Sequence, residues 1–364
     1  MISKEKMQAA PAADAANRSG IKMNMLKSFR RTVRVIPRSK DSMPGGTTGL
    51  LQTSVPAMSS RRGRTTRRNP HDVPKCTPFV KWAGGKTQLI RRLECCFPKS
   101  FNRYFEPFLG GGSVFFHLAY LKPSLKATVS DLNADLINAY EVIRDDPGKL
   151  TEQLAGLQSD FRAVQDNRSD KKLFYTSIRS RPPGLESSPV ERAAWFIFLN
   201  KTSFNGLYRV NSKGEFNVPY GDYPNVTLFH EKNLMNIHAL LNREGIELLR
   251  CDYTEVLLQN AGRHDFVYLD PPYYSDGNRG FTGYNASLFT GDDQARLAEI
   301  VSTLTERGCK VVVSNADSAF VKRLFDRTRP AGHNYYYEKL KALRAINCNG
   351  SARTGAPELL IRNF

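Results

Sequence analysis

Short apolar runs alternate with longer amphipathic stretches through most of the chain after residue 100. The apolar runs predict buried strands, because a strand covered on both of its faces has no polar side. Longer stretches with helical spacing of their apolar residues, such as DDQARLAEIVSTLTERG, predict amphipathic helices between the strands. The predicted strands lie within 103–108, 126–131, 246–251, 266–269, 310–318 and 358–364. We therefore expect an α/β fold built on one parallel sheet.

The region between the second and third predicted strands departs from this alternation. Residues 141–190 are polar and helical in pattern, with a loop at 180–189, and residues 195–224 interleave aromatic, amide and basic side chains. Within the second segment, LYRVN and EFNVPY flank the Gly-containing turn SKG, which predicts a β-hairpin. Such a ribbon can enter a DNA groove, where Asn and Arg reach base edges, whereas an ordinary exposed hairpin normally lacks this density of them.

The pattern divides the chain into three parts. Residues 73–145 and 246–364 form the predicted catalytic domain, and 146–245 form an inserted, mainly helical recognition domain that carries the hairpin. Residues 1–72 are rich in Arg, Ser, Gly and Pro, with few periodic apolar positions, so we expect a disordered extension. Its role is open between a non-specific nucleic-acid tether, a dispensable leader and, less favoured, an organelle transit peptide.

A glycine turn follows the first predicted strand, at 110–112, and leads into an apolar helix. Glycine is needed where the backbone must approach a nucleoside closely. Asp131 ends the second strand, 19 residues after Gly112, where Rossmann-like folds place a carboxylate that accepts hydrogen bonds from ribose hydroxyls. Asp131 or Asn133 could instead cap the next helix. Together, turn, spacing and carboxylate favour a nucleoside cofactor.

The stretch AGGKT, at 83–87, suggests a P-loop, but its spacing excludes one. A Walker A loop needs a glycine four intervening residues before the GK pair, and Val80 stands there. We expect a glycine turn leading into a helix, with Trp82 and Lys86 beside a ligand and Lys81 facing another way. The simpler alternative is a packed tryptophan with surface lysines.

The predicted strand FVYL, at 266–269, ends in Asp270, Pro271, Pro272 and Tyr273. The prolines could do no more than end the strand at a rigid turn. The alternative is that the turn presents Asp270 as part of a functional site.

Composition limits the possible settings of the protein. The 364 residues are 40% hydrophobic, enough for a sizeable core, but no apolar run reaches the roughly 20 residues of a membrane helix. The N-terminus lacks the apolar centre of a secretory signal, and the six cysteines show neither zinc-ligand nor disulfide spacing. We expect a cytoplasmic monomer with reduced thiols, no metal and no membrane partner.

The charge favours a polyanionic partner. The net charge is +18, and residues 1–72 contribute 15 basic and 4 acidic side chains to it. Basic side chains release counterions from phosphates on binding, so nucleic acid is the expected partner.

The motifs together resemble the Dam-type, D12-class N6-adenine DNA methyltransferases, in the alpha-group order. The resemblance covers residues 78–364 and rests on FVKWAGGK, FEPFLGGGSVF, SDLNADLINAY, FNGLYRVNSKGEFNVPYG, LDPPYY, VVVSNAD and ELLIRNF. It implies a Rossmann-like, S-adenosylmethionine-dependent methyltransferase sheet that modifies adenine in double-stranded DNA, in a bacterial or phage-infected cell. The family suggests GATC as the target, and a partner restriction enzyme could accompany such a protein.

The resemblance also implies roles for particular residues. The cofactor would be bound by Trp82, Lys86, Phe108, Gly110, Gly112, Asp131, Asp252 and Asp270. DNA would be contacted by Lys81, Phe204, Asn205, Leu207, Arg209 and Pro219, with Phe204 in place of a tyrosine that wedges between bases. Asp222 departs from the pattern, because Dam enzymes typically carry a basic residue there, and a carboxylate near phosphates is repulsive.

The DPPY stretch then has a chemical reading. Adenine N6 is a poor nucleophile until acceptors hold its two N–H groups, and Asp270 with the Pro271 carbonyl can supply them. Pro272 stiffens the turn, and Tyr273 offers a face for a flipped-out base. Methyl transfer is then a direct displacement. The alternatives are an N4-cytosine or RNA-base methyltransferase, disfavoured by the Dam-like hairpin, and a non-catalytic DNA-binding relative, disfavoured by the intact DPPY.

Overall fold

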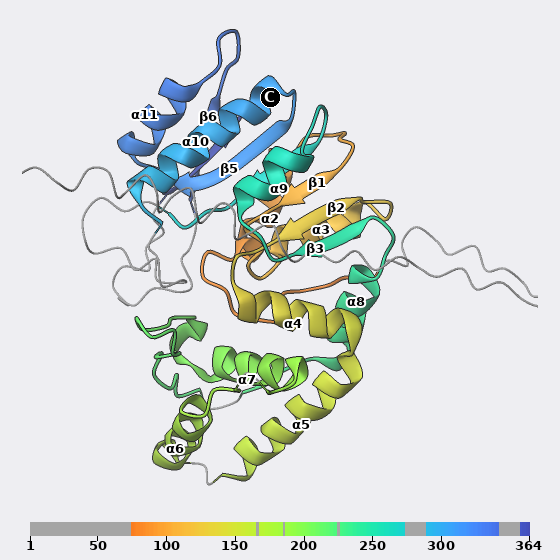
Figure 1. Cartoon of the computed structure of the whole chain (residues 1–364), viewed down its shortest axis with the longest axis vertical. Coiled ribbons are helices and arrows are strands. Elements are labelled where there is room, and N and C mark those ends of the chain that lie inside the picture. The colour runs from red at the N-terminus through yellow and green to blue at the C-terminus, as the bar shows by residue number, and fades with distance from the viewer. Residues whose placement is uncertain (1–73, 165–166, 185, 224–225, 274–288, 342–356) are drawn as a thin grey trace, which may run out of the picture. The chain divides into compact units, whose positions relative to one another are not determined.

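A computed structural model of the chain describes residues 74–164, 167–184, 186–223, 226–273, 289–341 and 357–364. These residues belong to one unit, Thr66–Phe364, and the extension expected at 1–72 lies outside them. A seven-stranded sheet runs through this unit in the order β3-β2-β1-β4-β5-β7-β6 (Figure 1). Its strands are β1 (Tyr104–Glu106), β2 (Ala127–Ser130), β3 (Ile246–Leu249), β4 (Phe266–Leu269), β5 (Lys310–Ala316), β6 (Tyr336–Lys341) and β7 (Pro357–Arg362).

The direction of the last strands differs from the prediction. Strands β3, β2, β1, β4 and β5 are parallel, as expected, but β7 runs antiparallel to both β5 and β6. The expectation of an entirely parallel sheet is therefore wrong, because an apolar run such as ELLIR does not encode its own direction. Strand β6 was not predicted, since its sequence YYEKLK carries charges typical of a sheet edge.

Both faces of the sheet are buried, which explains the uninterrupted apolar runs. Along β4, Phe266 and Tyr268 join one core cluster, whereas Val267 and Leu269 join a second. The first cluster includes residues of α2 (Ile90–Cys95), α3 (Ser113–Leu121), α4 (Ala134–Asp145) and α8 (Glu231–Leu241). The second includes residues of α9 (Tyr253–Asn260), α10 (Gly291–Glu306) and α11 (Ala319–Thr328). Alternate side chains of one strand thus serve opposite layers.

The helical pattern predicted for residues 141–190 is confirmed. The helices are α5 (Pro147–Ala163), α6 (Arg168–Arg179) and α7 (Pro189–Thr202), followed by the 3₁₀ turn η3 (Phe204–Gly206). Helix α7 begins with a capping box between Ser188 and Glu191, which closes the loop predicted before it. Figure 1 shows α4 between the sheet and these helices. Their aromatic side chains belong to the same core cluster as α3 and α4, so this region packs continuously against that layer.

Two further observations concern the described residues. None of their helices is long and apolar enough to cross a membrane. The cysteines among them, Cys76, Cys95, Cys96, Cys251 and Cys309, are free thiols, and Cys348 lies outside this part of the chain.

Candidate active site and DNA-recognition hairpin

The strand order reverses between β1 and β4, and the predicted site residues lie at this point. Strand β1 leads outward to β2 and β3, whereas its other neighbour, β4, leads to β5. In open α/β sheets, the carboxyl ends of two such strands flank a crevice that binds ligands. The glycine turn at 110–112 follows β1, and Asp270 follows β4. The topology therefore brings together two motifs that lie far apart in the sequence.

An ion pair joins Lys86 to Asp270. The Lys86 Nζ lies 2.7 Å from Asp270 Oδ2, and it donates to the Gly84 carbonyl at 2.6 Å. The Lys86 side chain is only 3% exposed, so the alternative of a surface lysine is wrong at this position. Burial raises the pKa of the Asp270 carboxyl to about 6, against the opposing effect of the Lys86 ammonium. Asp270 is therefore mainly ionised at neutral pH but close to its titration range.

Two buried glutamates surround this pair, and sequence reasoning assigned neither to the site. Glu106, at the end of β1, accepts a hydrogen bond from the Tyr104 hydroxyl at 2.7 Å. Burial raises the pKa of Glu106 to about 8, so it is largely protonated at neutral pH. Glu358, on β7, places Oε2 3.9 Å from the Lys86 Nζ. The available signal was a charged residue within each of two otherwise apolar strands.

The turn that carries Asp270 is held by a hydrogen bond from α10. Gln294 on α10 donates from Nε2 to the Pro272 carbonyl at 3.0 Å, and its Oε1 accepts from Asn315 Nδ2 at 2.8 Å. Both amide side chains have no exposed surface. A buried and mutually satisfied amide pair fixes the carbonyl orientation, because any rotation would leave a polar group unpaired.

The glycine turn is fastened by Asp131. Its two carboxylate oxygens accept the backbone N–H groups of Gly110 and Asn133, each at 2.9 Å. Asn133, rather than Asp131, caps α4 by accepting from the Leu136 N–H, which decides between the two capping candidates. Each carboxylate oxygen accepts more than one hydrogen bond, so Asp131 keeps capacity for ribose hydroxyls.

Trp82 closes over the same turn. A Cβ atom added at Gly110 would lie 2.6 Å from Trp82 Cδ1, so only glycine permits this approach. Trp82 also packs against the hairpin, because its ring and that of Tyr208 stack with centroids 6.0 Å apart. The Tyr208 hydroxyl donates to Asp135 on α4 at 2.6 Å.

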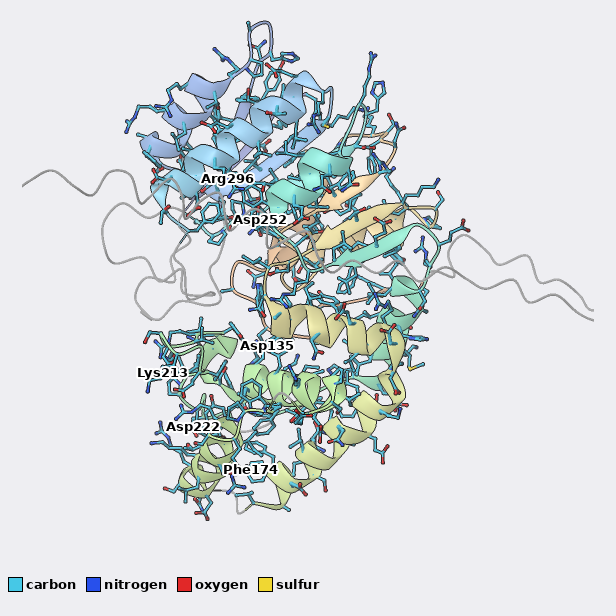
Figure 2. The ribbon with its side chains drawn as sticks, in the orientation of Figure 1. Asp135, Phe174, Lys213, Asp222, Asp252 and Arg296 are labelled. Atoms are coloured by element: carbon cyan, nitrogen blue, oxygen red, sulfur yellow. The ribbon has the colours of Figure 1, made fainter. Side chains whose placement is uncertain are left out.

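Phe108 follows the carboxyl end of β1, and Asp252 follows that of β3. The ring of Phe108 packs on that of Tyr253 at 5.1 Å. Asp252 caps α9 by accepting from the Thr254 N–H at 2.9 Å. Arg296 approaches Asp252 Oδ1 at 3.8 Å. Both residues are labelled in Figure 2. The eight predicted cofactor residues thus lie on the turn before η2 (Lys86–Gln88), at the first residue of η2, or after the carboxyl ends of β1 to β4.

The predicted hairpin is present, though its ladder is short. Val210 bridges Phe216 and Ser203 bridges Tyr220, both in antiparallel fashion. Across it, Arg209 donates from Nε to the Asn217 side chain at 2.5 Å and from a terminal nitrogen to the Asn217 carbonyl at 3.1 Å. Arg209 therefore has a fixed direction on the ribbon.

The remaining predicted DNA contacts gather at the start of the hairpin. The Phe204 N–H donates to the Pro219 carbonyl at 2.8 Å, which places these two residues side by side. Phe204 is 39% exposed, which is unusual for a large apolar ring, and Asn205 has a positive φ of 56°. Leu207 follows the 3₁₀ turn and is half-buried.

Lys81 is joined to this turn through Asn200. Asn200, 1% exposed, accepts from the Lys81 N–H at 2.7 Å and donates to the carbonyls of Lys81 and Gly206 at 2.7 and 3.1 Å. The Lys81 Nζ lies 3.7 Å from the centre of the Tyr223 ring, whereas the Lys86 Nζ contacts Asp270. The two lysines thus face different parts of the molecule, as predicted.

Known proteins resemble the chain over most of its length. The family described as D12 class N6 adenine-specific DNA methyltransferase matches residues 82–346. Type II methyltransferase M.MjaIII of Methanocaldococcus jannaschii is 40% identical over 79% of this chain and 99% of its own length. Type II methyltransferase M1.LlaDCHI of Lactococcus lactis is 35% identical over 79% of this chain and 95% of its own, and the DNA adenine methylase of Escherichia coli K12 is 31% identical over the same shares.

The chain belongs to the D12 class of N6 adenine-specific DNA methyltransferases. The resemblance drawn from its motifs is thereby confirmed, and with it DNA as substrate and methyl transfer to adenine as the reaction.

Asp222, the acidic residue noted in the sequence where a basic one was expected, has a charged partner in the structure. Its carboxylate pairs with the Arg168 guanidinium at 3.1 Å, between the end of the hairpin and α6 (Figure 2). The pair lowers the repulsion that an unpaired carboxylate would exert on phosphate. Asp222 has a φ of 53°, a left-handed conformation that Asp and Asn adopt more readily than other side chains.

Proposed function

We propose that this methyltransferase activates the N6 amine of a flipped-out adenine with Asp270 and the Pro271 carbonyl. The buried Lys86–Asp270 pair at the switch point carries the proposal, because it keeps one carboxylate ionised in a site of low exposure. An ionised carboxylate accepts an N–H bond more strongly than a neutral acid. The Pro272 carbonyl already accepts from Gln294, so the carbonyl of Pro271 is the more available second acceptor.

Methyl transfer then needs orientation rather than a covalent intermediate. The two acceptors would hold N6 with its lone pair directed at the methyl group, and the Tyr273 ring would stack on the base. The proton released from N6 would leave through Asp270, whose pKa of about 6 suits a transient acceptor near neutral pH.

The methyl donor of the proposal is S-adenosylmethionine, whose sulfonium supplies an electrophilic methyl group. Its binding residues would be Trp82, Lys86, Phe108, Gly110, Gly112, Asp131, Asp252 and Asp270. The donor set fits a nucleoside, because Asp131 and Asp252 offer carboxylate oxygens, and Phe108 and Trp82 offer apolar ring faces beside a glycine turn.

Residues 146–245 form the proposed recognition domain, and its substrate is double-stranded DNA. The exposed Phe204 ring would enter the base stack, while Asn205, Leu207, Arg209 and Pro219 approach base edges and Lys81 approaches from the neighbouring loop. GATC is the proposed target, and the protein would act as a cytoplasmic monomer. Family membership makes adenine N6 the favoured acceptor over cytosine N4 or an RNA base.

The test compares the wild-type protein with Asp270→Asn on duplexes that contain or lack GATC. Nucleoside mass spectrometry after incubation with labelled S-adenosylmethionine identifies the product. We expect N6-methyladenine from the GATC duplex, and a loss of at least about a hundredfold in the variant with DNA binding retained. N4-methylcytosine as product, or near-normal turnover by Asp270→Asn, would contradict the proposal.

A further inference from the structure

Lys86 lies between two carboxylates that come from different strands. One is Asp270 after β4, at 2.7 Å, and the other is Glu358 on β7, at 3.9 Å. The ammonium has three N–H donors, of which Asp270 and the Gly84 carbonyl take two. The third donor has Glu358 just beyond hydrogen-bond distance. A shift of the ammonium by little more than 1 Å would exchange one carboxylate partner for the other.

Glu358 has a buried oxygen without a partner. Its Oε2 makes no hydrogen bond with the described residues, and its side chain is only 7% exposed. The Tyr273 hydroxyl is likewise buried, and it lies close enough to the Asp270 and Glu358 carboxylates that burial, then their charges and an interaction with the Glu358 side chain raise its pKa. Buried carboxylate oxygens are costly unless they are satisfied, so this arrangement indicates that Glu358 gains a partner in another state of the enzyme.

The proposed chemistry would gain from such a state. Asp270 can accept an N–H bond from adenine N6 on its other oxygen, but a carboxylate already paired with an ammonium is a weaker acceptor, so release of its Oδ2 from Lys86 would strengthen its hold on N6. The Lys86 side chain is 3% exposed, so its ammonium, once released from Asp270, would remain as a buried charge without a counter-ion, which is strongly unfavourable. A second carboxylate within reach removes that penalty.

We propose that Glu358 is a positioning residue that takes over the Lys86 ammonium when the target adenine enters, so that Asp270 becomes free to hold N6. The inference rests on the proposed role of Asp270. The flexible four-carbon stem of lysine allows the movement, while the Gly84 carbonyl keeps the ammonium in place. No covalent bond changes, and the site keeps its net charge throughout.

The plateau rate of methyl transfer, compared with base flipping, distinguishes this role from simple packing, and the pH profile reports the charge of Glu358. The groups that face Asp270 are Lys86 from η2, Tyr104 and Glu106 from β1, Tyr268 from β4, Tyr273 from the turn and Glu358 from β7. Burial is the largest cause of the raised pKa of Asp270, Lys86 opposes it, and the negative charge of Glu358 adds to it. Removing that charge should therefore lower the pKa of Asp270. Loosened packing would hydrate the site and lower this pKa too, but it would also weaken base flipping.

The experiment measures single-turnover methyl transfer by Glu358→Gln against pH, with cofactor and duplex saturating. We expect the plateau rate to fall at least about tenfold, because Lys86 stays on Asp270, and the acid limb to move to lower pH. Duplexes with 2-aminopurine at the target position report base flipping without a 6-amino group, and their fluorescence change and DNA affinity should stay within about twofold of wild type.

Two further variants complete the test. Glu338→Gln removes a charge from the neighbouring edge strand β6, at an exposed position, and should alter neither the rate nor the pH profile. An unchanged plateau rate in Glu358→Gln would overturn the inference. It would also be overturned if the rate and the 2-aminopurine signal for base flipping fell equally while the acid limb of the pH profile stayed in place. Asp270→Asn, measured in parallel, should be inactive. If it is active, the role of Asp270 has failed instead, and the inference that depends on it fails too.

Discussion

The protonation state of Asp270 gives the sharpest prediction about this enzyme. Its carboxyl titrates at about 6 instead of the usual 3.8, because the site is buried and Lys86 only partly compensates. The active form in the proposed mechanism is the carboxylate, so activity is present above this pKa and is lost as the pH falls through it. The ratio of carboxylate to acid changes from about ten to one at pH 7 to about one to ten at pH 5. The rate of transfer should therefore fall about tenfold between these values.

The assay measures kcat/KM for the duplex from pH 5 to 8 at subsaturating DNA, which reports the ionisation of the free enzyme to which this pKa belongs. Glu106→Gln is the matched control, because Glu106 has a pKa of about 8 and is already mostly neutral below pH 7. That variant should keep the acid limb. Retained DNA binding at pH 5 would exclude unfolding as the cause of the loss. A rate that stays level down to pH 5, as an ordinary aspartate would give, refutes the reasoning.

Four other changes test different parts of the structure. Gln294→Leu removes the donor to the Pro272 carbonyl and should lower kcat on the order of tenfold with an unchanged Kd for DNA; an equal loss in both would place its effect elsewhere. Arg209→Ala should relax base discrimination by about 1–3 kcal/mol on singly substituted GATC duplexes, whereas a parallel loss on all duplexes would make it a phosphate contact. Asp222→Asn keeps a side chain suited to a φ of 53° and should raise affinity equally for all sequences, with a steeper salt dependence; a changed target would make Asp222 part of the readout. Deleting residues 1–72 removes 15 basic and 4 acidic side chains and should flatten the salt dependence of DNA affinity, which an unchanged slope contradicts.

The sequence was sufficient for those features that depend on local pattern. The strand FVYL, its end at Asp270, the glycine turn and the hairpin turn at Gly214 all follow from apolar runs and breakers in short windows. The direction of β7 did not follow, because strand direction is decided by the partner it pairs with, and that partner is distant in the chain. The charged edge strand β6 was missed for a related reason, since Tyr336, Glu338 and Lys339 of this strand are exposed.

The site was predicted in its separate parts but not in its electrostatics. Lys86, Glu106, Asp270 and Glu358 come from four segments spread over most of the chain, and only the sheet brings them together. Their burial decides which of them carry charge, and burial is a property of the packed structure. A motif therefore indicated that Asp270 is important, whereas only the fold shows its ion pair with Lys86 and the Glu358 carboxylate near the same ammonium.

The loop that carries Lys81 and Trp82 packs directly against the start of the hairpin. Asn200 bonds the backbone of Lys81 to Gly206, and a Cβ at Gly206 would lie 2.4 Å from the Lys81 side chain, so the two loops are in direct contact. The next residue, Trp82, packs on the glycine turn and on the ring of Tyr208 in the hairpin. A residue proposed to bind the cofactor thus shares its packing with the element proposed to read DNA. A displacement of the hairpin on binding DNA would therefore reach the Trp82 ring through Tyr208, because close-packed protein interiors transmit strain.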